Sequence, residues 1–172
     1  QFEVKLIYRA DRFLRGGDQT PFARNAFTAV RMSEMNENFI HQHENVRVEN
    51  GIHYGDLPEY MDFEYLRKVS AVNLASLASL ANSPDQPQEV KIDVRGLSNK
   101  STLLWEAPEI GKAKGYYVLM RETSSAMWEK KFWTTETSLT LPYSKDNYFF
   151  AVQSVSESGA ESLPVFPTPL SR

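Results

Sequence analysis

The spacing of apolar residues changes near the middle of the 172-residue chain, and this change predicts two regions of different architecture. Between Asp62 and Asn82 apolar residues recur near the helical period, which predicts a helix over residues 63–81 with Asp62 as its N-cap. Pro84 and Pro87 then end the helix and mark a short linker. The periodic positions are Leu66, Val69, Leu74, Leu77 and Leu80. This face of the helix is expected to pack on a sheet.

Beyond the linker, apolar and polar residues alternate with period two, the pattern of half-buried strands. Five strands are predicted, at residues 90–94, 101–105, 116–121, 138–141 and 148–155. Short strands at this spacing are typical of a β-sandwich, with Trp105, Tyr117 and Phe150 expected in its core. The chain is therefore divided into a first region at 1–82, a linker at 83–87 and an all-β sandwich at 88–172.

The first region has the pattern of an α/β segment. Phe2, Val4 and Leu6 alternate within residues 1–8, which predicts a strand entered at once. A tight turn follows at Gly16 and Gly17, and then a short helix through residues 23–26, capped by Asp18 or Thr20. A sheet that starts without lead-in, at a residue other than Met, indicates the tail of a longer domain. We expect a segment upstream of Gln1 to be its partner.

Composition narrows the classes of partner. Residues 1–82 hold 9 Lys and Arg against 11 Asp and Glu, and residues 83–172 hold 10 against 11, so the net charges are −2 and −1. Neither region is a basic nucleic-acid surface, and no apolar run is long enough for a membrane span. The absence of cysteine excludes disulfides and thiolate metal sites. It is compatible with the cytoplasm or with export, and a periplasmic or secreted bacterial location is favoured.

The first candidate for chemistry is a histidine pair. His41 and His43 are two of the three histidines, and Glu34, Glu37 and Glu44 flank them. Neutral imidazole and carboxylate are the usual ligands of zinc. The same residue types also gather in ordinary surface loops, so the sequence around the pair decides between the two interpretations.

That surrounding sequence consists of Arg15-Gly16-Gly17-Asp18-Gln19-Thr20-Pro21-Phe22, Ala29-Val30-Arg31, Val46-Arg47-Val48-Glu49-Asn50-Gly51, Tyr54-Gly55-Asp56-Leu57-Pro58 and the predicted helix. In this order and at these spacings, residues 1–82 resemble the C-terminal part of the zinc aminopeptidases of metallopeptidase family 28. The resemblance implies an α/β fold, the C-terminal part of a zinc-exopeptidase sheet. It also implies a loop histidine that supplies the last ligand of a two-zinc site.

The family's ligand histidine commonly begins a His-Thr-Pro-x-Asp pattern, and this pattern falls on residues 41–45. The resemblance therefore implies His41 as the metal ligand, because a start at His43 would place Arg47 at the aspartate position. Residues that would orient the ligand or line the substrate pocket are Asp18, Gln19, His43 and Asn45. The chain departs from the family pattern at Gln19 and Asn45, where His and Asp are expected, and at Ile40, where some members carry a Tyr.

By this resemblance the whole protein is a zinc-dependent aminopeptidase acting on peptide substrates, with two zinc ions that activate water and polarise the scissile carbonyl. The other ligands and the general base are expected upstream of Gln1. This chain would then hold one metal ligand and no catalytic residue, and is expected to be inactive alone. The alternative is a non-catalytic binding or scaffold protein that keeps the peptidase fold without the metals, which the three departures would permit.

Residues 86–170 resemble a fibronectin type III domain, with Trp105 in the second strand, Tyr117 in the third and Tyr148 opening the longest. Three further aromatic residues, Trp128, Phe132 and Trp133, fall on a connection and the strand after it, where a sandwich often exposes side chains. They serve either strand packing or the docking of a sugar, a peptide or another domain. The favoured docking partner is the peptidase region.

Overall fold

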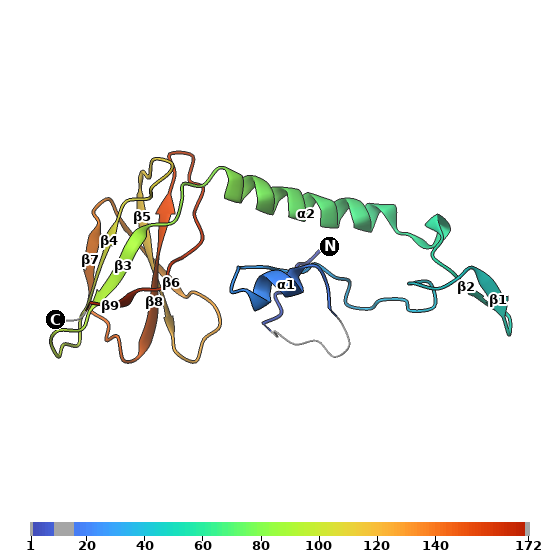
Figure 1. Ribbon diagram of the computed structural model, residues 1–172, viewed down its shortest axis with the longest axis horizontal. Coiled ribbons are helices and arrows are strands. Elements are labelled where there is room, and N and C mark those ends of the chain that lie inside the picture. Colours follow the sequence, from blue (N-terminus) through green and yellow to red (C-terminus); the bar gives the residue numbers. More distant parts are fainter. Residues whose placement is uncertain (1, 9–15, 171–172) are drawn as a thin grey trace. The chain divides into compact units, whose positions relative to one another are not determined.

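The computed structural model describes residues 2–8 and 16–170 (Figure 1). The chain divides into two units, residues 1–73 and residues 74–172, and each is described by itself. The predicted strand at residues 1–8 is wrong for the part described, because residues 2–8 have no regular secondary structure. An extended segment becomes a strand only when a neighbour pairs with its backbone groups. The described part of this unit provides no such neighbour for it.

The first helix in the described part of the first unit is the short helix α1, Gln19–Arg24. Asp18 stands at its N-cap position but its side chain makes no capping bond. The Thr20 hydroxyl instead accepts a hydrogen bond of 3.3 Å from the Gly17 backbone N–H. A short helix is therefore present, but it ends at Arg24 and neither predicted cap is formed. Thr20 instead closes the turn before the helix.

A hairpin follows, formed by β1, Arg47–Glu49, and β2, Ile52–Tyr54, which pair antiparallel with Glu49 opposite Ile52. Its two turn residues, Asn50 and Gly51, both have positive φ, 51° and 78°. Asn-Gly is the preferred pair for a two-residue hairpin turn of this kind, because both residues tolerate the left-handed region. This is the only sheet found among the described residues before 83. The α/β segment therefore stays a prediction.

The 3₁₀ helix η1, Pro58–Tyr60, leads into α2, Phe63–Ala81, the helix that the apolar spacing predicts. Asp62 caps it as predicted, accepting a hydrogen bond of 2.9 Å from the Tyr65 backbone N–H. No residue of α2 is buried, and its leucines remain largely exposed. Among the described residues, no helix is both long and apolar enough to cross a membrane.

The second unit is a β-sandwich (Figure 1). One sheet has the order β7-β4-β3-β9 and the other the order β6-β5-β8. The strands of the first sheet are β3, Gln88–Asp93, β4, Ser101–Glu106, β7, Ser138–Leu141, and β9, Thr168–Leu170. Those of the second are β5, Gly115–Glu122, β6, Lys130–Thr134, and β8, Tyr148–Val155. All five strands predicted by range are present, and β6 is the strand expected at Phe132 and Trp133. The remaining strand, β9, pairs parallel with β3 and was not predicted.

The core of the sandwich lies between the two sheets. Trp105 and Phe150 are buried in it as predicted, with exposed fractions of 4% and 3%. Tyr116, not Tyr117, is the tyrosine of β5 that belongs to the core. The prediction for Tyr117 is wrong because successive side chains of a strand point to opposite faces. Tyr117 lies on the outer face, with its ring centre 5.1 Å from that of Trp133.

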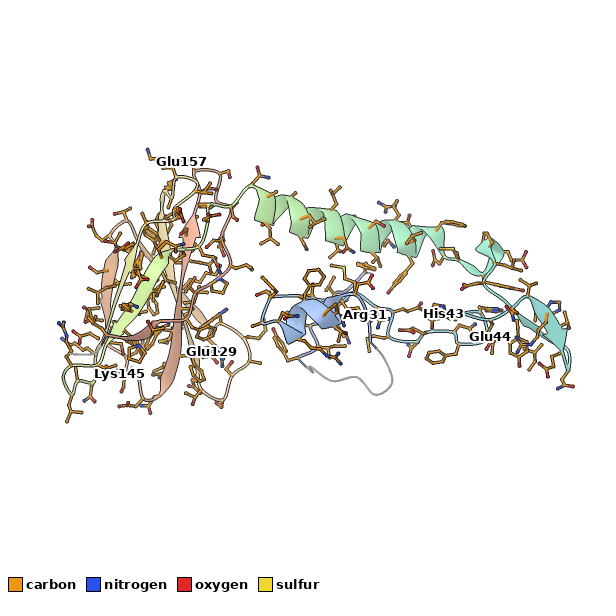
Figure 2. The ribbon with its side chains drawn as sticks, viewed as in Figure 1. Arg31, His43, Glu44, Glu129, Lys145 and Glu157 are labelled. Atoms are coloured by element: carbon orange, nitrogen blue, oxygen red, sulfur yellow. The ribbon has the colours of Figure 1, made fainter. Side chains whose placement is uncertain are left out.

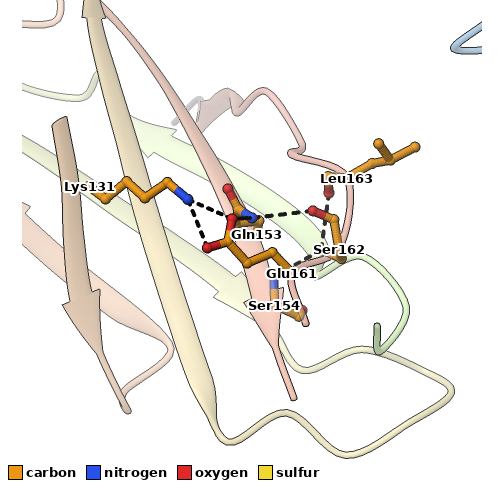
Figure 3. A network of polar contacts seen from close by, with 6 residues as sticks. All are labelled: Lys131, Gln153, Ser154, Glu161, Ser162 and Leu163. Carbon is orange, nitrogen blue, oxygen red and sulfur yellow. Dashed lines mark hydrogen bonds and ion pairs between the residues drawn. The ribbon is translucent and has the colours of Figure 1, made fainter. Parts of the chain in front are cut away.

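The free edge of β8 is covered by residues 161–165. Val152 and Val165 exchange two backbone hydrogen bonds of 2.8 and 2.9 Å, and the Ser162 hydroxyl accepts one of 2.9 Å from the Ser154 N–H. On the outer face, the Glu161 carboxylate binds Lys131 of β6 (Figure 3). This segment satisfies backbone groups that would otherwise offer a pairing edge to another chain.

Candidate functional site

His41 lies in an irregular loop that backbone hydrogen bonds hold in shape. Its own N–H donates to the Asn38 carbonyl over 3.2 Å, and the Gly55 N–H donates to the Ile40 carbonyl over 3.3 Å. Gly55 has φ of +129°, and a Cβ there would stand 2.9 Å from the Val46 Cα. Only glycine fits this close approach. The turn at Gly55 therefore brings the chain after β2 back against the residue that precedes His41.

The His41 ring is stacked on Tyr60. The two ring centres are 3.7 Å apart and the planes are within 14° of parallel. Partial burial, followed by the charge of neighbouring Glu59, raises the pKa of Tyr60, so its phenol stays protonated at neutral pH. The flat neighbour restricts rotation of the imidazole about its side-chain bonds, which fixes the ring plane.

The Nδ1 atom of His41 is buried and has no hydrogen-bond partner among the described residues. An imidazole that binds a metal through one nitrogen carries its proton on the other, and that N–H normally finds an oxygen acceptor. A buried donor without a partner costs about 1–3 kcal/mol. The Asn45 side chain does not supply this acceptor here. Nδ1 is thus the polar atom of the His41 ring that the described residues leave without a partner.

His43 follows His41 by two residues in the same irregular loop and lies beside Glu44 (Figure 2). Its side chain is exposed, its φ is +57°, and its backbone N–H donates to the Asp56 carboxylate over 3.2 Å. The left-handed conformation is uncommon for a residue with a side chain, though histidine tolerates it better than most. Asp56 thus connects the loop after β2 to the turn that follows His41. His43 takes part in this connection through its backbone N–H and not through its side chain.

The Glu44 carboxylate, next to His43 in the sequence, is engaged by an arginine. Glu44 contacts Arg47 over 2.6 Å, and Arg47 also binds Glu49 over 3.1 Å while its guanidinium covers Tyr54 at 4.0 Å from the ring centre. Both carboxylates raise the pKa of Arg47, and Glu44 has the larger effect. Within residues 2–8 and 16–170, no three His, Cys, Asp or Glu side chains are grouped so that they could hold a metal ion. A zinc site uses three or four protein ligands. The residues around His41 could therefore supply one ligand of such a site but not the whole set.

The glycine-rich turn is not joined to His41 by any hydrogen bond or ion pair in the described part of the chain. Asp18 and Gln19 stand at the start of α1, where the Arg31 side chain donates to the Gly16 carbonyl. Asn45 is exposed, and its carbonyl accepts a long bond of 3.4 Å from Arg47. The roles of Asp18, Gln19, His43 and Asn45 beside a metal stay predictions.

The three aromatic residues singled out in the sandwich lie in three different settings. Phe132 is partly buried and packs against the core. Trp133 is 43% exposed and rests on Tyr117. Trp128 is half-buried, with its ring centre 5.5 Å from that of Phe166 and 5.5 Å from the Arg121 guanidinium. Their use as a docking surface stays a prediction.

Sequence reasoning missed Tyr60 and Asp56 as the residues that position the histidines. Asp56 lies within the Tyr54-Gly55-Asp56-Leu57-Pro58 stretch, but nothing in that stretch indicates its contact with His43. Nothing in the spacing indicates a ring stack between His41 and Tyr60, because it is made by the turn at Gly55.

No family model matches the chain. Curated relatives named "Probable zinc metalloprotease" align with nearly all of it. A relative from Leptosphaeria maculans is 45% identical over 167 residues, which cover 96% of this chain and 39% of the relative. Relatives from Pyrenophora tritici-repentis and Pyricularia oryzae are both 42% identical, over 97% of this chain and 35% and 34% of their own lengths. The chain thus spans little more than a third of these relatives.

Among solved structures, the chain is similar to an Fn3-like protein from Clostridium thermocellum, with 21% identity and a TM-score of 0.43 over 53% of this chain and 98% of the other. It is also similar to the protein titled FN3tt, with 20% identity and a TM-score of 0.40 over 49% of this chain and 89% of the other.

Proposed function

We propose that this chain works as part of a zinc-dependent aminopeptidase of the metallopeptidase family 28 type, in which His41 supplies one metal ligand. The relatives named zinc metalloproteases support the metal and the hydrolase class. The arrangement of residues 15–81 supports the finer assignment to aminopeptidases. The observation that carries the proposal is the state of His41, a ring fixed against Tyr60 with a buried and unpartnered Nδ1.

In this proposal His41 binds zinc through Nε2. The buried nitrogen is Nδ1, so Nε2 is the atom left to bind the metal. Nδ1 would then carry the ring proton and donate it to an oxygen outside the described chain. Tyr60 would hold the ring plane, and the bond from His43 to Asp56 would hold the loop. When bound, zinc lowers the pKa of a water molecule and polarises the substrate carbonyl.

The remaining ligands of both zinc ions and the general base would be residues outside this sequence. The same residues would be the folding partner of residues 1–82. Among the described residues of 2–82, Gly55 is the only one that is buried. Large apolar side chains there are exposed, among them Ile7, Val30, Met35 and Leu74 at 70%, 79%, 70% and 69%. A surface of this kind is typical of an interface. The apolar side chains of this region would pack against that partner.

The test is made in the full-length protein that carries this chain. Changing His41→Ala should remove at least one zinc ion, measured by elemental analysis, and nearly all release of the N-terminal residue from a peptide. The matched variant His43→Ala should keep metal and most of the activity, because its contribution is through the backbone N–H. Full zinc content in the His41 variant, or a larger loss in the His43 variant, would refute the assignment of the ligand.

A second measurement uses the 172-residue chain alone. With one donor and no base it should release no product from an aminoacyl chromogenic substrate. Turnover that a chelator removes would refute the proposal that the site is completed from outside. A full-length protein that binds no zinc and cleaves no peptide would favour the non-catalytic scaffold.

A further inference from the structure

A modification motif lies in the sandwich and takes no part in the metal chemistry. The tripeptide Asn99-Lys100-Ser101 has the form Asn-x-Ser with x other than proline, which is the acceptor pattern for N-linked glycans. None of the other eight asparagines of the sequence has Ser or Thr two residues later. From the place of this tripeptide in the fold we propose that Asn99 is an N-glycan acceptor.

Asn99 lies in the loop that joins β3 to β4, at the end of the hairpin (Figure 1). Every residue from 94 to 100 is exposed. No hydrogen bond to the Asn99 side chain is found within the described part of the chain. A glycan on its Nδ2 would therefore displace no contact and enter no packed region.

The loop has a defined shape that presents Asn99 outward. Arg95 binds Asp93 through two side-chain hydrogen bonds of 2.7 and 3.0 Å, and the Lys100 N–H donates to the Ser98 hydroxyl over 3.0 Å. Leu97, between these two points, is completely exposed. The tip of this loop therefore faces solvent, as the acceptor position for a glycan requires.

Ser101 imposes an order of events. Its side chain is completely buried, and its hydroxyl donates to the Tyr143 carbonyl over 2.7 Å. The folded sandwich thus hides the hydroxyl that the transferring enzyme must recognise. Modification would take place before β4 pairs with β7, on the extended chain, and folding would then bury Ser101 while leaving Asn99 outside.

Attachment of a glycan to Asn99 requires a donor, which is an oligosaccharide carried on a lipid diphosphate. The Nδ2 atom of Asn99 attacks C1 of the first sugar, the C1–O bond to the diphosphate breaks, and the lipid diphosphate leaves with the electron pair. The amide loses one proton, so atoms and charge balance. The relatives described above come from eukaryotes, in which this donor meets chains that enter the secretory pathway. The proposal does not depend on the metal site.

The experiment secretes the full 172-residue chain from a eukaryotic host behind a cleavable leader. We expect a heavier species that peptide N-glycosidase reduces to the mass of the glycan-free chain with aspartate in place of Asn99, which the peptide map would locate. Asn99→Gln should abolish the mass shift. Ser101→Thr keeps the acceptor pattern and should keep the shift, and Asn147→Gln, at an exposed asparagine without the pattern, should leave it unchanged.

Tryptophan fluorescence keeps the test decisive, since it shows whether each secreted variant is folded. Asn99→Asp serves as a second acceptor-free variant should the glutamine variant fail to fold. A folded, secreted wild-type chain at unmodified mass would overturn the proposal. A shift that persists in a folded Asn99 variant would overturn it equally.

Discussion

Lys131 on β6 reaches across the outer face of its sheet to Glu161, with Nζ 2.6 Å from Oε2 (Figure 3). The lysine passes over β5, where its Nζ lies 5.1 Å from the centre of the Tyr117 ring. The same carboxylate oxygen accepts a hydrogen bond of 2.7 Å from the buried Gln153 amide on β8. One contact therefore links β6, β8 and the segment that covers the edge of β8.

Removing this carboxylate should destabilise the sandwich. Glu161→Ala leaves the Gln153 amide with a single acceptor, the Ser162 carbonyl at 3.3 Å, and should cost about 1–2 kcal/mol. Glu161→Gln keeps an oxygen for Gln153 and loses only the half-exposed ion pair, so it should cost less than about 1 kcal/mol. Urea unfolding followed by tryptophan fluorescence measures both, because all three tryptophans, Trp105, Trp128 and Trp133, lie in the sandwich. Equal losses would show that Gln153 does not depend on Glu161.

Gly115 should not tolerate a methyl group. A Cβ there would stand 2.6 Å from the Trp133 ring and 2.8 Å from the Thr134 carbonyl. Gly115→Ala should therefore lower the free energy of unfolding by about 1–3 kcal/mol, since the ring and the strand must both move. Gly96→Ala, where nothing lies within 4 Å, is the matched control and should be nearly neutral. An unchanged urea midpoint for the Gly115 variant would contradict this packing.

The loop before Asn99 should make stability depend on pH in acid. Hydrogen bonds from the Arg95 side chain and backbone lower the pKa of Asp93 to about 2, from about 3.9 in an unfolded chain. A carboxyl group whose pKa is lower in the folded than in the unfolded state stabilises the fold at pH values above its unfolded pKa. This contribution is lost as the pH falls from about 4 to 2. Thermal midpoints of the wild type and Asp93→Asn should therefore differ most above pH 4 and converge near pH 2. A constant difference across this range would exclude Asp93 as the source.

The two regions should behave differently when expressed apart. Residues 86–172 contain the buried core and should melt cooperatively as a monomer. Residues 1–82 bury Gly55 alone among their described residues, and about 80 residues bury only about 60% of their unfolded surface even in a complete fold. They should self-associate or stay unfolded, as light scattering and circular dichroism would show. A monomeric 1–82 segment with a sharp melting transition would contradict the proposed need for a partner.

Much of the secondary structure follows from local sequence. The bounds of α2 are set by the Asp62 cap and by Pro84, and the five strands of the sandwich follow from period-two alternation. These signals act over a few residues, so they need no knowledge of distant contacts. The same holds for His41, whose residue type and surroundings are enough to make it a candidate ligand.

Tertiary structure decided which faces and which neighbours these elements have. Alternation in β5 does not reveal that Tyr116 faces the core and Tyr117 the solvent, because that depends on the side from which the second sheet packs. Residues 161–165 carry no strand pattern and pair with β8 only because its edge is free. His41 meets Tyr60 through the turn at Gly55. Pairing and stacking join residues far apart in the chain, and sequence periodicity carries no information about such distances.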